Sequence, residues 1–241
     1  MLMDCKRPLS LVLAVTACLT MLFGYKAQNT ETLLVSDDTV AVSKIKTGWL
    51  FDGAGEDDAL IFYPGALVEP AAYAPLLRNI AAAGVDCFLV KMPMNLAVLS
   101  PNKAKRVMQD QTYDRWFFAG HSLGGAMAAQ YVSKHLDTPA GLFLLGAYTA
   151  KDLTLAAFPV VYVYGSEDGV LNRDRLEKGI LMSPVDTLTI ELEGGNHAQF
   201  GVYGQQKGDG KPTISPEAQQ TAAANEILRV IRTAAQRQQA A

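Results

Sequence analysis

Residues 116–125 read Trp-Phe-Phe-Ala-Gly-His-Ser-Leu-Gly-Gly, and this stretch decides the fold. Its first four residues predict a buried strand, and the apolar spacing from Gly124 to Leu136 predicts a helix directly after it. Gly120 and Gly124 lie two residues before and after Ser122, where side chains would collide across a sharp turn. We therefore expect Ser122 on a strained strand-to-helix turn, with an exposed hydroxyl near the N–H groups of the helix.

Outward from this stretch, strand-like and helix-like patterns alternate along the chain. Strands are expected at 39–43, 49–51, 59–63, 87–90, 141–145, 160–164 and 188–192. Helices are expected at 70–83, 104–109, 171–180 and 216–237. This alternation predicts an α/β fold with a mainly parallel central sheet and helices on both faces. In such sheets the catalytic and ligand-binding residues lie at the carboxyl ends of the strands.

The composition fits one globular domain and excludes several classes of protein. The chain has 241 residues, of which 49% are hydrophobic, and a formal net charge of −3. With 21 basic and 24 acidic residues it lacks the basic character of a nucleic-acid-binding protein. Of the three cysteines only Cys87 lies in the predicted globular part, and no Cys/His spacing indicates a metal site. We expect no metal and no organic cofactor.

Residues 1–27 are expected to form a separate segment. No residue from Pro8 to Tyr25 is charged, and basic residues flank this stretch on both sides. As a helix it would reach about 27 Å, which approaches the thickness of a bilayer core. A retained membrane anchor is the favoured interpretation, and a cleaved signal peptide, a lipoprotein signal at Cys18 and a buried first helix are the alternatives. The basic N-terminal side predicts that residues 28–241 lie outside the cytoplasm, or are secreted if the segment is cleaved.

A serine hydroxyl becomes a good nucleophile only beside a base, and the chain contains three histidines. His121 belongs to the turn itself and is expected to pack or hydrogen-bond locally. His135 lies about three turns along the following helix, too far from Ser122. His197 follows the strand 188–192 in a loop with glycines on both sides, which predicts an exposed, mobile position. We therefore expect His197 to be the base.

The base needs a carboxylate that fixes its orientation and its tautomer. The strand 160–164 is followed by Gly165-Ser166-Glu167-Asp168-Gly169. Asp168 is the first choice because it lies further round the turn, and Glu167 is the alternative. An ordinary Asp-Gly turn with no catalytic role is the third interpretation. The order Ser, Asp, His, each after its own strand, favours Asp168.

Acyl transfer also needs two N–H donors for the oxyanion. Leu123 supplies one as the residue after the serine, and Ala66 in Tyr63-Pro64-Gly65-Ala66-Leu67 is the expected second donor, with Leu67 as the alternative. A plain Pro-Gly turn is also possible there.

Two further segments bear on the pocket. The loop 91–97, with two methionines, fits either an acyl pocket or core packing. The stretch between Leu145 and Val160 leaves little room for a lid.

Several of these motifs resemble those of α/β-hydrolase family 5. They are Tyr63-Pro64-Gly65-Ala66, Val68-Glu69-Pro70, Lys91-Met92-Pro93, the Gly120–Gly125 turn, Tyr164–Gly169 and Glu193–His197. The resemblance runs from about Thr30 to the C-terminus. It implies an α/β-hydrolase fold and a triad of Ser122, Asp168 and His197, and the short stretch between Leu145 and Val160 predicts no substantial lid domain. It implies no particular substrate. Pro64-Gly65 stands where many α/β-hydrolases have His-Gly. This departure lies in the segment that is expected to supply the second oxyanion donor.

The expected function is that of a carboxylesterase, which cleaves small or medium acyl esters through an acyl-enzyme. An envelope acyltransferase with the same three residues and a catalytically silent binding protein on this fold are the alternatives. A dienelactone-hydrolase-like reaction is disfavoured because those enzymes use cysteine at the position of Ser122. The expected partners are a small-molecule ester and, through residues 1–27, a membrane, with no nucleic acid. The sequence does not predict the oligomeric state.

Overall fold

The computed structural model describes residues 24–109 and 111–239. The expected N-terminal anchor, residues 1–27, therefore lies outside the described residues except for its last four. Within the described ranges, no helix combines the length and the apolar character needed to cross a bilayer.

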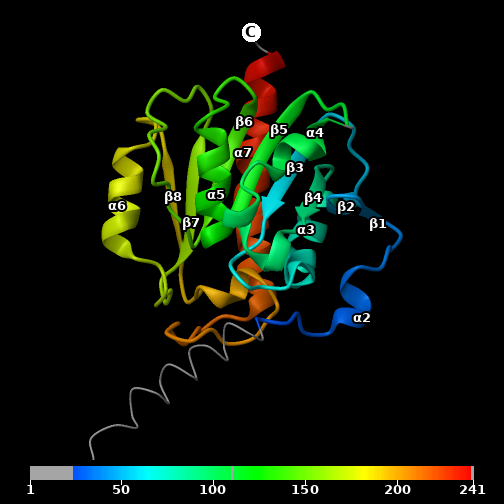
Figure 1. Cartoon of the computed structure of the whole chain (residues 1–241), viewed down its shortest axis with the longest axis vertical. Helices are drawn as coiled ribbons and strands as arrows, with labels where there is room; N and C mark the ends of the chain where they lie inside the picture. Colours follow the sequence, from blue (N-terminus) through cyan, green and yellow to red (C-terminus); the bar gives the residue numbers. More distant parts are fainter. Residues whose placement is uncertain (1–23, 110, 240–241) are drawn as a thin grey trace, which may run out of the picture.

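Eight strands form one central sheet (Figure 1). They are β1 Ala41–Ile45, β2 Gly48–Asp52, β3 Asp58–Tyr63, β4 Asp86–Val90, β5 Arg115–His121, β6 Pro139–Leu145, β7 Val160–Gly165 and β8 Leu188–Leu192. Their order is β1-β2-β4-β3-β5-β6-β7-β8. Only β2 runs against the others, because it pairs antiparallel with both β1 and β4, whereas β4, β3, β5, β6, β7 and β8 pair in parallel. The predicted mainly parallel sheet is confirmed.

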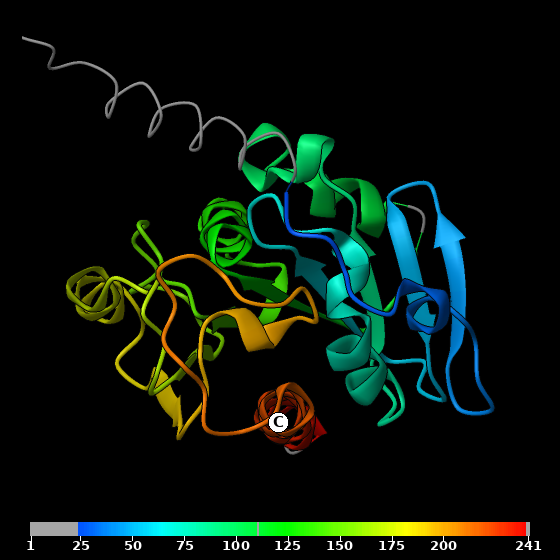
Figure 2. The ribbon, with the colours of Figure 1, turned by 90° about the horizontal axis from the view of Figure 1, so that it is seen from below.

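Helices cover both faces of this sheet (Figures 1 and 2). The α-helices are α2 Thr30–Leu33, α3 Ala74–Ala81, α4 Lys103–Met108, α5 Leu123–Val132, α6 Arg173–Leu181 and α7 Pro216–Gln239. Four short 3₁₀ turns are η1 Pro70–Tyr73, η2 Pro93–Asn95, η3 Ala97–Leu99 and η4 Ala198–Phe200. Helices α3 and α7 pack on one face, and α4, α5 and α6 pack on the other. Residues 146–159, between β6 and β7, form only turns, and the described ranges contain no lid domain.

The strand β3 shows why the central strands are continuously apolar. Leu60 and Phe62 belong to the core beneath α3 and α7. Ala59, Ile61 and Tyr63 belong to the core beneath α4 and α5. Because successive side chains of a strand point to opposite faces, a strand covered on both sides buries every residue.

The helix expected over 124–136 is observed as α5, which ends at Val132, and two other predicted helices differ in their bounds for a clear physical reason. The helix expected over 70–83 is divided into η1 and α3. Pro75 has no N–H with which to continue a helical ladder, and the Ala74 N–H instead forms a short-range bond to Ala71 O. The helix expected from Leu171 begins at Arg173, because the Asn172 side chain accepts the Arg175 N–H and caps the helix there.

Candidate active site

Ser122 lies on the turn between β5 and α5, in a backbone conformation that non-glycine residues rarely adopt. Its φ is 52° and its ψ is −127°. A Cβ atom at Gly120 would lie 2.6 Å from the carbonyl carbon of Gly124, so that glycine is required by the turn itself. A Cβ atom at Gly124 would lie 2.1 Å from Tyr63 O, so the second glycine is required by the end of β3. The predicted sharp strand-to-helix turn is present, with Ser122 at its apex.

Asp168 and His197 come from the loops after β7 and β8 and form a buried pair. His197 Nδ1 lies 2.8 Å from Asp168 Oδ2, and the side chains are 1% and 0% exposed. The other carboxylate oxygen accepts the N–H groups of Val170 at 3.0 Å and Leu171 at 2.8 Å. The carboxylate is thus held by the backbone, and it fixes the proton of His197 on Nδ1.

The alternative acid does not reach this pair. Glu167 is exposed, and within the described ranges its carboxylate accepts only the Ser166 hydroxyl, at 3.2 Å. Of the two acidic residues in the loop, only Asp168 contacts His197.

Ser122 and His197 line one pocket of about 240 Å³, together with Leu123, Tyr148 and Leu171 among others. His197 Nε2 is shielded from solvent and has no hydrogen-bond partner among the described residues. Because Nδ1 is bonded to Asp168, Nε2 is the nitrogen with a free lone pair. A Cβ atom at Gly146 would lie 2.9 Å from His197 Nδ1, so the loop after β6 presses against the pair.

The prediction that His197 is exposed was wrong. His197 is 1% exposed, and the loop around it packs against α7. A Cβ atom at Gly195 would lie 2.8 Å from Gln219 Oε1, and the Asn196 N–H donates to the same oxygen at 2.9 Å. The glycines that suggested exposure allow close packing instead.

The loop after β3 contains the expected second oxyanion donor. The Leu67 N–H donates to Asn95 O at 2.8 Å, so Leu67 is not available as the alternative donor. The N–H groups of Ala66 and Leu123 have no acceptor among the described residues. A Cβ atom at Gly65 would lie 2.8 Å from the Tyr73 hydroxyl, which makes glycine necessary beside Ala66.

Tyr73 connects this loop to the serine turn, a role that the sequence did not indicate. Its hydroxyl accepts the Gly65 N–H at 3.0 Å and lies 2.8 Å from His121 Nδ1. Burial, together with the nearby His197 ring, holds the pKa of His121 well below its usual value of 6.5. Burial raises the pKa of Tyr73. The neutral His121 therefore accepts a hydrogen bond from the Tyr73 hydroxyl at Nδ1, which confirms that His121 is bonded locally.

The third histidine is not part of the site. His135 lies beyond the end of α5, where its Nδ1 is 2.8 Å from Tyr131 O and its ring stacks on Tyr131. It lines no part of the pocket that contains Ser122.

Asp209 is the second residue that the sequence did not single out. Its Oδ1 accepts the N–H groups of His197 at 3.1 Å and Gly169 at 3.2 Å, and its Oδ2 accepts that of Ala198 at 2.8 Å. Its Oδ1 also accepts the N–H of the following residue, Gly210, at 2.9 Å. One carboxylate therefore joins the loop of the candidate acid to the loop of the candidate base.

The methionine loop does not line the pocket. Met92 is buried in the core beneath α4 and α5, whereas Met94 is 78% exposed. Neither residue borders the pocket that contains Ser122. Core packing is therefore correct for Met92, and the acyl-pocket interpretation is wrong for both.

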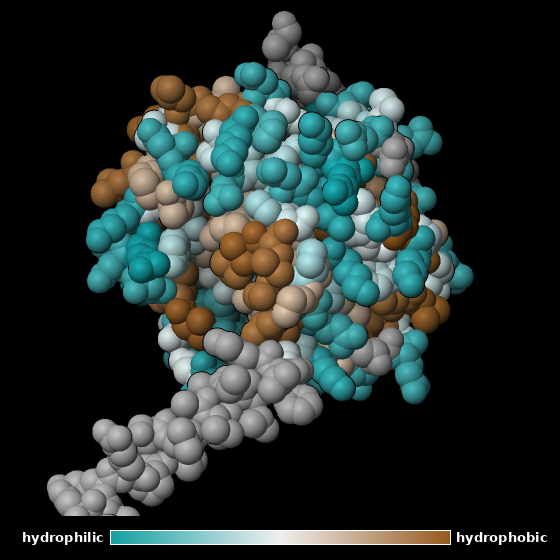
Figure 3. Space-filling view, viewed as in Figure 1, coloured by the Kyte–Doolittle hydropathy of each residue, from teal (hydrophilic) through white to brown (hydrophobic). Residues whose placement is uncertain are grey.

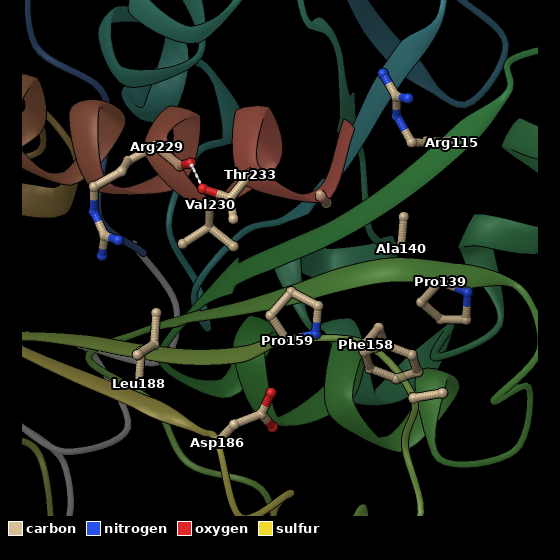
Figure 4. Close-up of a pocket in the computed structure, with 12 residues that line it drawn as sticks. Arg115, Pro139, Ala140, Phe158, Pro159, Asp186, Leu188, Arg229, Val230 and Thr233 are labelled. Atoms are coloured by element: carbon tan, nitrogen blue, oxygen red, sulfur yellow. Dashed lines mark hydrogen bonds between the residues drawn. The ribbon is translucent and has the colours of Figure 1, made fainter. Parts of the chain in front are cut away.

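A pocket of about 500 Å³ lies at the opposite ends of the strands (Figure 4). Its lining includes Arg115, Pro139, Pro159 and Leu188, at or beside the amino ends of β5, β6, β7 and β8, and Arg229 of α7. Ser122 and His197 lie at the carboxyl ends, so this pocket is separate from the candidate site. Among the described residues, no group of three or more His, Cys, Asp or Glu side chains is placed to hold a metal ion.

Comparison with known proteins gives a match over most of the folded chain. A family model described as "Alpha/beta hydrolase family" matches residues 59–221. No curated protein sequence matches the chain. Among solved structures, it is similar to a dienelactone hydrolase from Anabaena variabilis, with 11% identity, a TM-score of 0.57, and coverage of 80% of this chain and 99% of that chain.

Two further solved structures are similar. They are Est1E from Butyrivibrio proteoclasticus, with 11% identity, a TM-score of 0.57, and coverage of 81% and 100%, and a thioesterase domain from the curacin biosynthetic pathway, with 14% identity, a TM-score of 0.58, and coverage of 79% and 100%. At these identities the structures support the fold alone.

Proposed function

Because this chain belongs to the alpha/beta hydrolase family, we propose that it is a serine hydrolase that cleaves carboxylic esters with Ser122, His197 and Asp168. One observation carries the proposal. The buried pair of His197 Nδ1 and Asp168 Oδ2, 2.8 Å apart, leaves Nε2 without a partner among the described residues, in the pocket that Ser122 also lines. A serine activated by an oriented imidazole is the arrangement that acyl transfer requires.

The reaction proceeds in two halves. His197 Nε2 accepts the Ser122 proton as Oγ bonds to the acyl carbon, and the carbonyl electrons move onto oxygen. The N–H groups of Leu123 and Ala66 hold this oxyanion. The intermediate expels the alcohol, which takes the proton from Nε2 and leaves an acyl-serine. Water then gives a proton to Nε2 and attacks the acyl carbon, and the acid leaves as Ser122 recovers its proton.

The pocket supports a small or medium acyl group. Its volume of about 240 Å³ lies below the roughly 300–1,000 Å³ of sites that take drug-sized ligands. The lining near Ser122 includes Ala126, Ala147 and Leu171, which are apolar and suit an acyl chain.

The test compares Ser122→Ala with Ser133→Ala, a matched serine at the end of α5 whose hydroxyl donates to Gln130 O. Ser122→Ala is expected to lower kcat for short p-nitrophenyl esters by roughly 10⁴- to 10⁶-fold and to abolish labelling by a fluorophosphonate. Ser133→Ala should keep both. Full turnover by Ser122→Ala would end the proposal, and product analysis with added alcohols would separate hydrolysis from acyl transfer.

A further inference from the structure

The first described residues are hydrogen-bonded to the loop that contains Ala66. The Tyr25 N–H donates to Leu67 O at 2.7 Å, and the Glu69 N–H donates to Tyr25 O at 2.8 Å. The Glu69 side chain accepts the Ala27 N–H at 3.0 Å. Figure 2 shows this dark blue segment running along the end of the molecule where the carboxyl ends of the strands lie. The chain therefore enters the fold at a fixed point beside the candidate active site.

Apolar side chains are exposed next to this entry point. Met94, Val98 and Leu99 are 78%, 52% and 54% exposed. Their segment is joined to the same loop, because Asn95 O accepts the Leu67 N–H. Met94 and Asn95 both have positive φ, at 51° and 53°, a conformation that costs about 1–2 kcal/mol per residue. Figure 3 shows that apolar residues gather in patches on an otherwise hydrophilic face.

Positive charge and aromatic rings lie beside these apolar residues. Lys26, Lys91, Tyr25 and Trp49 line one hollow of about 300 Å³, and both lysines are exposed. The one acidic residue of this hollow, Glu69, already accepts the Ala27 N–H. Lysines attract anionic headgroups, and tyrosine and tryptophan favour the boundary between lipid and water.

We propose that one surface, made of Met94, Val98, Leu99, Lys26 and Lys91, rests on a lipid bilayer. The uncharged stretch from Pro8 to Tyr25 leads directly to it, and under this proposal that stretch is the membrane anchor. An amphipathic surface beside an anchor buries its apolar side chains at the headgroup boundary while its lysines meet anionic lipid. The proposal goes beyond ester hydrolysis, because it concerns where the folded domain sits.

The test uses the full chain in vesicles of phosphatidylcholine and phosphatidylglycerol, with and without brominated acyl chains. Met94→Trp is compared with Leu181→Trp, a matched control that is 80% exposed and lies at the far end of α6. After subtraction of the emission that Trp49 and Trp116 give in the parent protein in the same vesicles, Met94→Trp should lose emission in brominated vesicles and Leu181→Trp should not. Lys26→Glu with Lys91→Glu should reduce that loss.

Two results would overturn the proposal. One is equal emission of Met94→Trp in brominated and ordinary vesicles. The other is an emission change that follows protein density rather than bromine, which would show that a second copy of the chain covers this surface. The vesicle measurement is repeated in the Ser122→Ala background, and turnover of a short soluble ester is measured separately with the parent protein. Membrane contact and the proposed hydrolase activity can then fail independently of each other.

Discussion

Replacing Asp209 with asparagine tests whether one carboxylate positions the base. Of the four N–H groups it accepts, those of His197 and Ala198 belong to residues that are 1% and 2% exposed. Asparagine keeps one oxygen for the donors on Oδ1 but turns an NH₂ group toward the Ala198 N–H. A buried donor without an acceptor costs about 1–3 kcal/mol, so the free energy of unfolding should fall by that amount.

The effect on catalysis should exceed what this loss of stability explains. Asp209 does not line the pocket, so KM should change little. A displacement of the imidazole of about 1 Å costs on the order of 10²-fold in rate. We therefore expect kcat to fall by about 10- to 100-fold in a protein that remains folded.

Three measurements check this expectation. Urea unfolding gives the stability, p-nitrophenyl acetate turnover gives kcat and KM, and proton NMR follows the downfield Nδ1–H of His197. Asp152→Asn is the matched control, because that exposed carboxylate accepts the Thr154 N–H and hydroxyl and does not line the pocket that contains Ser122. An Asp209→Asn protein with reduced stability but unchanged kcat and an unchanged imidazole resonance would refute the positioning role.

Gly124→Ala should lower Tm and remove activity, because its Cβ would lie 2.1 Å from Tyr63 O and overpacking of this kind costs about 1–3 kcal/mol; an active protein of unchanged Tm would contradict the steric argument. The depressed pKa of His121 means that the unfolded chain binds its proton below pH 6.5 and the folded protein does not. Stability should therefore fall as pH drops from 6.5 to 5, by up to about 1.4 kcal/mol per unit, and urea titrations of His121→Gln should show a shallower slope. Tyr73→Phe removes the acceptor of the Gly65 N–H, which should destabilise the fold by about 1–3 kcal/mol and lower kcat; an unaltered kcat would show that the loop does not depend on this hydroxyl.

The fold was largely predictable because its evidence is local. Buried central strands such as β3 and β5 require continuous apolar runs, and the Ser122 turn requires glycines at fixed spacing. Each signal occupies a few adjacent residues, and parallel strand order brings distant loops to one edge. The choice of Asp168 over Glu167 also came from its place in one turn.

The remaining features depend on contacts between segments far apart in the chain. Asp209 lies between two glycines and carries no local sign of the N–H groups at 169 and 197 that it accepts. Tyr73 lies within the helix expected over 70–83, and only the folded chain places its hydroxyl between Gly65 and His121. The burial of His197 was missed for the same reason, since Gln219 of α7 packs against its loop.

The position of β8 sets the order in which heat or denaturant would affect this protein. β8 is the outermost strand of the sheet at that side, hydrogen-bonded to β7 alone, and the His197 loop follows it directly. Outer strands open at lower free energy than central ones. If β8 separated from β7, the His197 imidazole would move away from the Ser122 turn while β3, β5 and β6 remained paired. Activity would therefore be lost before the far-ultraviolet circular dichroism signal.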